Sequence, residues 1–306
     1  MIKLPTTPAL DKDKLVEQIK DKFLNLKQYK YKRILAGFLD ENGNYLGDNF
    51  FETTFKFQDP KPPVVYEISG PFDSVSNKFA GIARVFYEAE LMFEYDHVGG
   101  INQRTAAMTL AYLLELKHKV QNILIFGPGK VSTQVVDYLK HFNKDLAKID
   151  YVHYEKLNAE FEKNVKAFGI EAKFTTSPDL QAYDTIILAT TTKDYCLTKP
   201  AFEKMKPGTC IVSLCTTSAA GEIEPACYGL ENVRVFLDYE DSKTFTSEMK
   251  EANEKGYLEN VSYFADVLKN KIEKSSDKIN LIRLTGTPMQ NIAVIEMMLE
   301  KEKISL

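Results

Sequence analysis

The chain has 306 residues, of which 44% are hydrophobic and 27% charged, proportions typical of a globular protein with room for two domains. Its formal net charge of −4 argues against a nucleic-acid-binding protein, which would carry a basic surface. No run of about 18 apolar residues occurs, so we expect no membrane-spanning helix.

The cysteines and the first residues bear on the cellular compartment. Cys196, Cys210, Cys215 and Cys227 form no CxxC pair and have no histidines at zinc-ligand spacing, so we expect free thiols and no metal site. The segment MIKLPTTPALDKDK carries charges and prolines where a signal peptide would need an apolar core. Both features predict a cytoplasmic protein.

The first third of the chain changes from a helical to a strand pattern. Residues 9–32 place Leu15, Ile19, Phe23 and Leu26 at helical spacing, which predicts an amphipathic helix. Strands are then predicted over 34–39, 53–57, 64–68 and 82–95, with a hairpin turn at 40–44 and Pro60, Pro62 and Pro63 as breaks. Residues 83–92 fit a helix equally well. This part reads as a mainly antiparallel sheet.

From residue 102 onward the pattern is that of an α/β protein. A helix is predicted over 102–117, just after Gly99 and Gly100. Strands then alternate with helices, which predicts a parallel, doubly wound sheet. The predicted strands are 123–126, 149–154, 171–174, 185–189, 211–214 and 233–237, and the helices between them 130–142, 156–168 and 199–205. Residues 243–274 read as largely helical, 282–288 as a loop or strand end, and 289–301 as a terminal amphipathic helix.

A glycine-rich turn follows the first strand of this alternating region. Ile123 to Phe126 is a short apolar run, Gly127-Pro-Gly129 interrupts it, and Val131 to Leu139 returns to helical spacing. Strand, glycine turn and helix are the context of a dinucleotide-binding fingerprint, in which the pyrophosphate lies against the helix N-terminus. The third glycine position holds Ser132, a small residue that still allows close packing. An ordinary strand-to-helix turn is the alternative.

Two further positions fit a dinucleotide site. Glu155 closes the next strand, where an acidic side chain can accept the ribose hydroxyls of adenosine and repel a 2′-phosphate, so NAD(H) is favoured. Lys156 beside it would suit a phosphate, so NADP(H) stays an alternative. Thr190, Thr191 and Thr192 follow the strand at 185–189 and would lie at the cofactor crevice, unless they cap a turn or helix.

Arg104 is the candidate for holding a substrate. It is predicted in the first turn of its helix, and a guanidinium there could bind a carboxylate through two parallel hydrogen bonds. An ordinary surface arginine is the alternative.

The order of the motifs resembles the ornithine cyclodeaminase/mu-crystallin family over about residues 95–300. The segments that carry the resemblance are RTAAM (104–108), GPGKVS (127–132), ATTTKDY (189–195), KPGTCIVSL (206–214), GEIEP (221–225), RVFLDYED (234–241) and IRLTGTPMQNIAV (282–294). The resemblance implies a Rossmann-type domain over 116–287. It also implies a second α+β domain for substrate binding and dimerisation, formed by 1–115 and 288–306.

The resemblance also implies roles for individual residues. Arg104 matches the arginine that holds the substrate carboxylate. The pyrophosphate turn corresponds to Gly127, Gly129, Lys130, Val131 and Ser132, the ribose acid to Glu155, and the crevice residues to Thr190, Thr191 and Thr192. Thr285 and Gly286 match the late loop beside the nicotinamide.

Three positions depart from the family pattern. Thr216 stands where cyclodeaminases have a catalytic Asp, and a threonine cannot act as a carboxylate base near neutral pH. The family's substrate-domain lysine has no counterpart in Gly81–Val85, although Arg84 or Lys78 could replace it electrostatically. Asn291 stands where the family often has Asp.

These observations predict a homodimeric NAD(H)-dependent oxidoreductase that acts on the Cα–N bond of a small amino or imino acid. An imine can arrive already protonated, so its reduction needs less help from a base than deamination does. The alternatives are a cyclodeaminase with a displaced base, a cofactor-binding protein without catalysis, and an opine-type condensing dehydrogenase. We expect neither a nucleic-acid nor a membrane partner.

Overall fold

The computed structural model describes residues 2–4, 7–39, 45–58, 61–73, 78–79, 81–153, 157–190, 192, 194–214 and 221–304. The chain forms two compact units, Met1–Arg104 with Thr287–Leu306, and Thr105–Gly286. The division falls inside the helix α2 (Val98–Glu115), whereas the predicted domain boundary follows residue 115. The substrate and cofactor roles of the two domains stay predictions.

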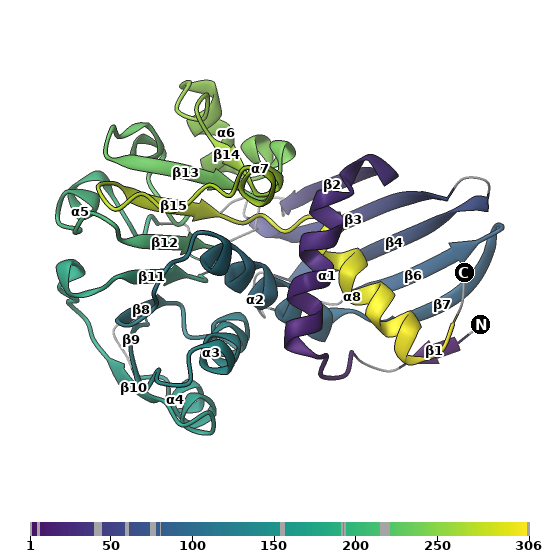
Figure 1. Ribbon diagram of the computed structural model, residues 1–306, viewed down its shortest axis with the longest axis horizontal. Coiled ribbons are helices and arrows are strands. Elements are labelled where there is room, and N and C mark those ends of the chain that lie inside the picture. The colour runs from purple at the N-terminus through teal and green to yellow at the C-terminus, as the bar shows by residue number, and fades with distance from the viewer. Residues whose placement is uncertain are drawn as a thin grey trace. The chain divides into compact units, whose positions relative to one another are not determined.

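The first unit is built on a mainly antiparallel sheet in the order β1-β7-β6-β4-β3-β2, with β5 on β4 (Figure 1). Its strands are β1 (Ile2–Leu4), β2 (Tyr29–Leu39), β3 (Tyr45–Gln58), β4 (Lys61–Asp73), β5 (Lys78–Phe79), β6 (Ile82–Tyr87) and β7 (Glu90–Asp96). The helices α1 (Lys12–Leu24) and α8 (Pro288–Lys301) lie side by side over one face of this sheet.

The helix α1 is shorter than the predicted 9–32. Asp11 caps its start by accepting the N–H of Lys14 at 2.9 Å, and a short 3-10 turn (Leu26–Gln28) follows its end. Tyr29 already pairs with Lys56 of β3. The helical pattern therefore ends where long-range strand pairing stabilises the chain more than continued helix would.

The segment from 82 to 95, which fitted helix or strand, is a hairpin. Glu88 and Ala89 connect β6 and β7 with φ of 51° and 63°, the left-handed values of a tight hairpin turn. The prediction that Pro62 and Pro63 interrupt the sheet was wrong, because both lie within β4. They sit beside a register shift between β3 and β4, where a missing backbone N–H is tolerated.

The two faces of this sheet differ in how far their apolar side chains are exposed to solvent. On the face toward α8, side chains such as Val64, Tyr66 and Ile68 are fully buried. On the opposite face Ile34, Phe51, Phe55 and Ile82 are between 36% and 45% exposed. The strand register places Ile34 beside Phe51. The chain therefore has an extended sheet face with exposed apolar side chains.

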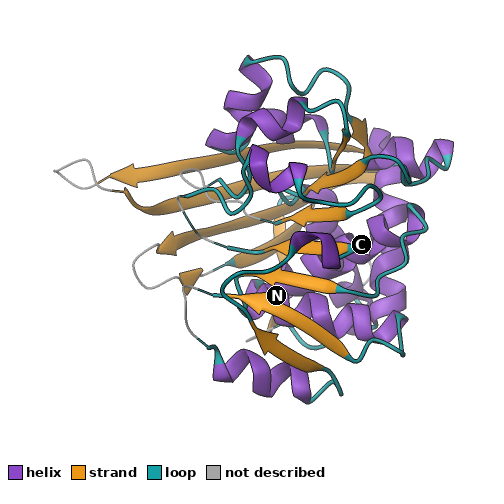
Figure 2. Cartoon of the chain, turned by 90° about the vertical axis from the view of Figure 1, so that its left-hand side faces the viewer, coloured by secondary structure: helices purple, strands orange, loops and turns teal. Residues whose placement is uncertain are grey.

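The second unit contains a parallel sheet in the order β10-β9-β8-β11-β12-β15-β13-β14, which confirms the α/β class with a Rossmann-type doubly wound sheet (Figure 2). Its strands are β8 (Ile123–Phe126), β9 (Lys148–Val152), β10 (Glu171–Phe174), β11 (Thr185–Leu188), β12 (Cys210–Ser213), β13 (Val233–Leu237), β14 (Ser262–Tyr263) and β15 (Ile279–Arg283). The helices are α3 (Lys130–Phe142), α4 (Ala159–Lys166), α5 (Lys199–Glu203), α6 (Ser247–Glu254) and α7 (Phe264–Asn270), and short 3-10 turns lie at Leu180–Ala182, Pro225–Gly229 and Glu240–Thr244.

The strand β15 was not predicted as such, because 282–288 was read as a loop or strand end. It lies between β12 and β13 and is fully buried. Asn280 and Arg283 hide its apolar pattern in the sequence. Asn280 is satisfied by the backbone of Ser275, and Arg283 pairs with Glu248. The stretch 243–274 is likewise broken into short helices and β14 rather than being largely helical.

Within the part of the chain that the structure describes, none of the helices combines the length and apolar character that crossing a membrane requires.

Candidate active site

The glycine turn passes directly against the end of the neighbouring strand β11. Gly127 has φ of +82°, and a Cβ built on it would lie 2.4 Å from the carbonyl oxygen of Ala189 and 2.9 Å from Cγ2 of Thr190. Only glycine fits this position, both in backbone conformation and in space. The turn therefore brings α3 close to the carboxyl end of the sheet.

Gly129 serves a different purpose. Among the residues that the structure describes, no atom would lie within 4 Å of a Cβ at this position, so their packing does not require a glycine there. Gly129 is the N-cap of α3 and makes no side-chain capping bond, so the first N–H groups of this helix are available beside open space. This is the geometry in which a helix N-terminus binds a phosphate.

Two neighbours fix the shape of the turn. Ser132 is fully buried and its hydroxyl donates to the carbonyl of Gly127, so the residue in the third glycine position adds a hydrogen bond. The amide of Asn158 donates to the carbonyl of Pro128 at 3.1 Å. Asn158 was not predicted as a site residue. Asparagine is a common helix N-cap, and Asn158 is the N-cap of α4. Lys130 is exposed and Val131 half-buried at the start of α3.

The described threonines after β11 face protein groups. Thr190 donates from its N–H and its hydroxyl to the carboxylate of Glu222, at 2.6 and 3.0 Å. Thr192 accepts the N–H of Asp194 at 3.0 Å, as a capping residue does. Thr191 lies outside the described residues, as does Glu155, so the predicted ribose contacts stay predictions.

The late loop is held by a buried aspartate at the end of β13. Thr285 is 2% exposed, and its N–H donates to Asp238 at 3.0 Å. Ser242 hydrogen-bonds both Asp238 and the hydroxyl of Thr285. Gly286 follows with φ of 73°. The loop is thus fixed at the carboxyl end of the sheet, and Asp238, present in the sequence as the Asp of RVFLDYED, is the residue that holds it.

Arg104 lies in the second turn of α2 rather than the first, because α2 begins at Val98 and includes Gly99 and Gly100. A Cβ at Gly100 would come within 2.9 Å of both His97 and Val294, so glycine allows α2 to approach α8 closely. Arg104 donates to the side-chain carbonyl of Gln290, the third residue of α8, at 2.8 Å. The guanidinium is therefore held at the start of α8, and its role in binding a substrate carboxylate stays a prediction.

A buried hydrogen-bonded chain lies near Arg104 in the first unit. His97 contacts Tyr95 OH through Nδ1 at 2.7 Å and Asn291 through Nε2 at 3.2 Å. The Asn291 amide also donates to both carboxylate oxygens of Glu52, at 3.2 and 3.3 Å. Since Asn291 donates to Glu52, its oxygen accepts the Nε2–H of His97. Burial and, to a smaller degree, the charge of Arg104 lower the pKa of His97 to about 4, so this histidine is neutral near pH 7.

Of the two residues predicted to replace the family's lysine, the structure describes the side chain of Arg84 alone. Arg84 projects from β6 on the face opposite to the buried Ala83 and Val85, and it pairs with Glu94 at 2.8 Å and Glu67 at 3.5 Å. Lys78 is in β5, but its side chain lies outside the described residues, as does the whole of Thr216. The structure therefore offers no support for Arg84 as a group that polarises the substrate.

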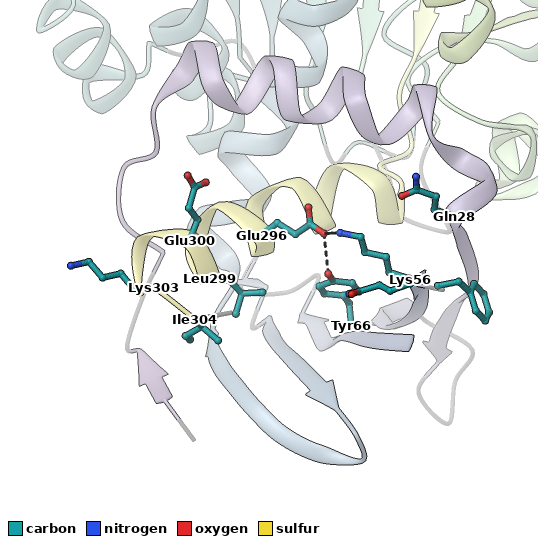
Figure 3. Close-up of a pocket in the computed structure, with 10 residues that line it drawn as sticks. Gln28, Lys56, Tyr66, Glu296, Leu299, Glu300, Lys303 and Ile304 are labelled. Atoms are coloured by element: carbon teal, nitrogen blue, oxygen red, sulfur yellow. Dashed lines mark hydrogen bonds and ion pairs between the residues drawn. The ribbon is translucent and has the colours of Figure 1, made fainter. Parts of the chain in front are cut away.

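A pocket of about 790 Å³ in the first unit contains neither Arg104 nor His97 (Figure 3). At its base Glu296 accepts hydrogen bonds from Lys56 at 2.6 Å and Tyr66 at 3.0 Å, and it also pairs with Lys22 at 2.7 Å. These groups satisfy one another. We read them as the junction between α8, α1 and the sheet rather than as a ligand site.

The described residues contain no cluster of His, Cys, Asp and Glu that could hold a metal ion. Cys196, Cys210 and Cys227 are free thiols, and burial raises the pKa of Cys210 and Cys227 to about 12. Neither of these two thiols has the character of a nucleophile at neutral pH.

The fold and the glycine turn define a two-unit α/β protein of the Rossmann type. Residues 101–305 match the model of the ornithine cyclodeaminase/mu-crystallin family. The chain therefore belongs to this family, and the resemblance drawn from its motifs is confirmed.

Solved structures share the fold at low sequence identity. The Δ1-pyrroline-2-carboxylate reductase of Thermococcus litoralis, solved with NADH and L-proline, gives a TM-score of 0.84 at 15% identity, covering 99% of this chain and 98% of that one. An archaeal alanine dehydrogenase dimer with bound NAD gives 0.79 at 14%, covering 97% and 94%. The iminosuccinate reductase of Paracoccus denitrificans, solved with NAD+, gives 0.76 at 16%, covering 97% and 94%. A comparison with curated proteins gave no match.

Proposed function

We propose that this protein is an NAD(H)-dependent oxidoreductase that transfers a hydride to or from the Cα of a small amino or imino acid. The glycine turn is the observation that carries the proposal. Gly127 brings α3 against the sheet, while Gly129 leaves open space at the first N–H groups of α3. That space suits the pyrophosphate of a dinucleotide. The family membership and the three NAD-bound or NADH-bound neighbours support the same cofactor.

The bound nicotinamide would supply or accept the hydride, and the protein would supply binding and orientation. Gly127, Gly129, Lys130, Val131 and Ser132 would hold the pyrophosphate through backbone groups and the helix N-terminus. Glu155, Thr191 and Thr192 are proposed for the ribose side, and Thr285 with Gly286 for the nicotinamide side. A Glu at position 155 favours NAD(H) over NADP(H).

Arg104 is proposed to bind the substrate carboxylate. It is held by Gln290, and the nearby His97 is neutral, so the positive charge of this cluster resides on Arg104. Thr216 stands at the position of the family's catalytic Asp. Reduction of an already formed imine needs less base catalysis than ornithine deamination, so an imine reductase fits this chain better than a cyclodeaminase.

The screen that tests the proposal follows NADH absorbance with cyclic imino acids and with 2-oxo acids plus amines. We expect oxidation of NADH with at least one carboxylated imine. Ammonia release from ornithine without net change in NADH would contradict the proposal and establish the lyase. NADH binding without turnover of any imine would establish a binding protein.

Replacing Arg104 with Ala tests the substrate site. Because a charge-assisted hydrogen bond contributes about 1.5–3 kcal/mol, we expect KM for the imine to rise roughly 10- to 100-fold while the Kd for NADH stays unchanged. Arg234→Ala is the matched control, because Arg234 lies in the second unit and donates to the backbone of Glu273. Equal loss of NADH and substrate binding in Arg104→Ala would count against the assignment.

We further propose that the exposed sheet face of the first unit forms a homodimer. Phe51 and Phe55 are 36% and 38% exposed on that face, where a second copy would cover them. The dimeric alanine dehydrogenase of the same fold supports this proposal. Phe55→Glu should convert a dimer into a monomer in light scattering, whereas Leu157→Glu, at an exposed leucine of the second unit, should not. A monomeric parent protein would refute it.

A further inference from the structure

Glu222 is a fully buried acidic side chain that the sequence motifs do not assign to any role. One of its oxygens accepts the N–H of Thr190 at 2.6 Å and the Thr190 hydroxyl at 3.0 Å. The other accepts the Ser213 hydroxyl at 2.7 Å and the N–H of Leu214 at 3.1 Å. Each carboxylate oxygen thus receives one backbone N–H, and the two acceptors face different strands.

These contacts join the carboxyl ends of two adjacent strands. Thr190 follows β11 and Leu214 follows β12, which are paired in parallel up to Leu188 and Ser213. At these strand ends the N–H of Leu214 still donates to the Leu188 carbonyl at 2.9 Å, and the Glu222 carboxylate adds a second acceptor for it and an acceptor for Thr190. Glu222 is itself fixed, because its N–H donates to Glu248 at 2.7 Å and its carbonyl accepts from Cys196 and Leu197.

The contact continues from Thr190 to the glycine turn. Cγ2 of Thr190 and the carbonyl of Ala189 are the atoms that a Cβ on Gly127 would strike, so residues 189 and 190 form the surface on which the turn rests. A shift of Thr190 would move that surface. The chain of contacts therefore runs from the Glu222 carboxylate through Thr190 to Gly127.

We propose that Glu222 is a positioning residue for the dinucleotide site, setting the separation of the β11 and β12 ends and thereby the shape of the crevice under the glycine turn. This rests on the proposed dinucleotide function. This role requires that both oxygens of the side chain accept hydrogen bonds. A glutamine at this position has one acceptor and one donor, so its amide would face either Thr190 N–H or Leu214 N–H donor to donor.

The test is NADH affinity by fluorescence titration, with melting temperature as a second readout. Glu222→Gln should raise the Kd for NADH tenfold or more, on the order of one lost charge-assisted bond. Tyr183→Phe is the matched structural control, since it removes a hydroxyl bond to Asp150 in the same unit, at the amino end of β11 and away from either carboxyl strand end. It should lower the melting temperature and leave the Kd for NADH within about twofold.

A milder variant covers the case in which Glu222→Gln does not fold. Ser213→Ala removes one donor to Glu222 and keeps the Leu214 bond, and we expect about a threefold rise in Kd for NADH. Unchanged NADH affinity in Ser213→Ala and Glu222→Gln would overturn the positioning role, as would equal weakening in Tyr183→Phe. Absence of NADH binding by the parent protein would instead overturn the proposed function.

Discussion

Carboxylates join elements in both units, the half-buried Glu296 in the first and the fully buried Glu222 in the second, but they do so with different partners. In the first unit Glu296 is held by two lysines and a tyrosine, Lys22, Lys56 and Tyr66. In the second unit Glu222 accepts hydrogen bonds from backbone N–H groups and hydroxyls. Ion pairs depend mainly on distance, whereas N–H donors also require alignment. The first arrangement suits an attachment between helices and sheet, and the second suits a site whose geometry must be fixed.

The largest expected effect comes from the glycine turn of the second unit, which needs exact backbone geometry. Gly127→Ala introduces a Cβ 2.4 Å from the Ala189 carbonyl at a φ of +82°. We expect roughly 4 kcal/mol or more of lost unfolding free energy and no measurable NADH binding. Denaturant unfolding and NADH titration check this. A variant of near-parental stability would show that the turn can move away from β11. The glycine turn would then not need a more exact geometry than the Glu296 attachment in the first unit.

Acid should destabilise both units through one buried histidine each. Burial lowers the pKa of His97 and of His118 to about 4, from an unfolded value of 6.5. The unfolded chain therefore binds more protons below pH 6.5, so stability is full above that pH and falls as pH decreases toward 4. Between pH 7 and 5 we expect a loss of about 2 kcal/mol per histidine.

Single variants separate the two histidines. His97→Gln and His118→Gln should each reduce the pH dependence of the unfolding free energy by about half, measured by urea denaturation at pH 7 and pH 5. His141→Gln serves as the control for histidine replacement. A pH dependence that neither variant changes would mean that other groups control acid stability.

The sequence predicted the second unit better than the first. The run from Ile123 to Leu139 carries strand, turn and helix in local order, and β8 and α3 have the bounds predicted from it. The pattern around Tyr29, by contrast, continues an amphipathic helix, and only pairing with Lys56 far along the chain makes it a strand. Local periodicity cannot reveal such a contact.

The candidate site shows the same limit. Gly127 and Arg104 stand in recognisable motifs, so their importance could be predicted. Glu222 appeared only as part of GEIEP, and nothing in its sequence neighbourhood indicates that it meets Thr190 and Leu214. Asn280 and Arg283 even concealed a central strand, because their partners Ser275 and Glu248 become apparent only in the folded chain. Sequence patterns therefore miss polar residues whose hydrogen-bond and ion-pair partners become apparent only in the folded chain.

A smaller effect is expected when the attachment in the first unit is weakened. Burial tends to raise the pKa of Glu296, but Lys22 and Lys56 outweigh it and lower the pKa, so the folded state favours the carboxylate. Glu296→Gln should cost about 2 kcal/mol of unfolding free energy, because Lys22 and Lys56 both lose the charge of the Glu296 carboxylate, while Lys22 still pairs with Asp21 at 3.2 Å. NADH affinity should not change, because this cluster attaches α8 rather than shaping the cofactor site. A parallel loss of NADH affinity would show that the attachment also sets site geometry.

The smallest stability effect is the most informative about the ligand. Gly129→Ala adds a Cβ that meets no atom of the described residues within 4 Å, at a φ of −110° that alanine adopts readily. Unfolding free energy should therefore change by less than about 0.5 kcal/mol. NADH binding should weaken tenfold or more, since the methyl group would occupy the space proposed for the pyrophosphate. Gly127→Ala and Gly129→Ala thus differ in kind, because one glycine is required by the protein and the other by its ligand. If Gly129→Ala binds NADH as tightly as the parent, the turn packs α3 against the sheet but does not hold a pyrophosphate.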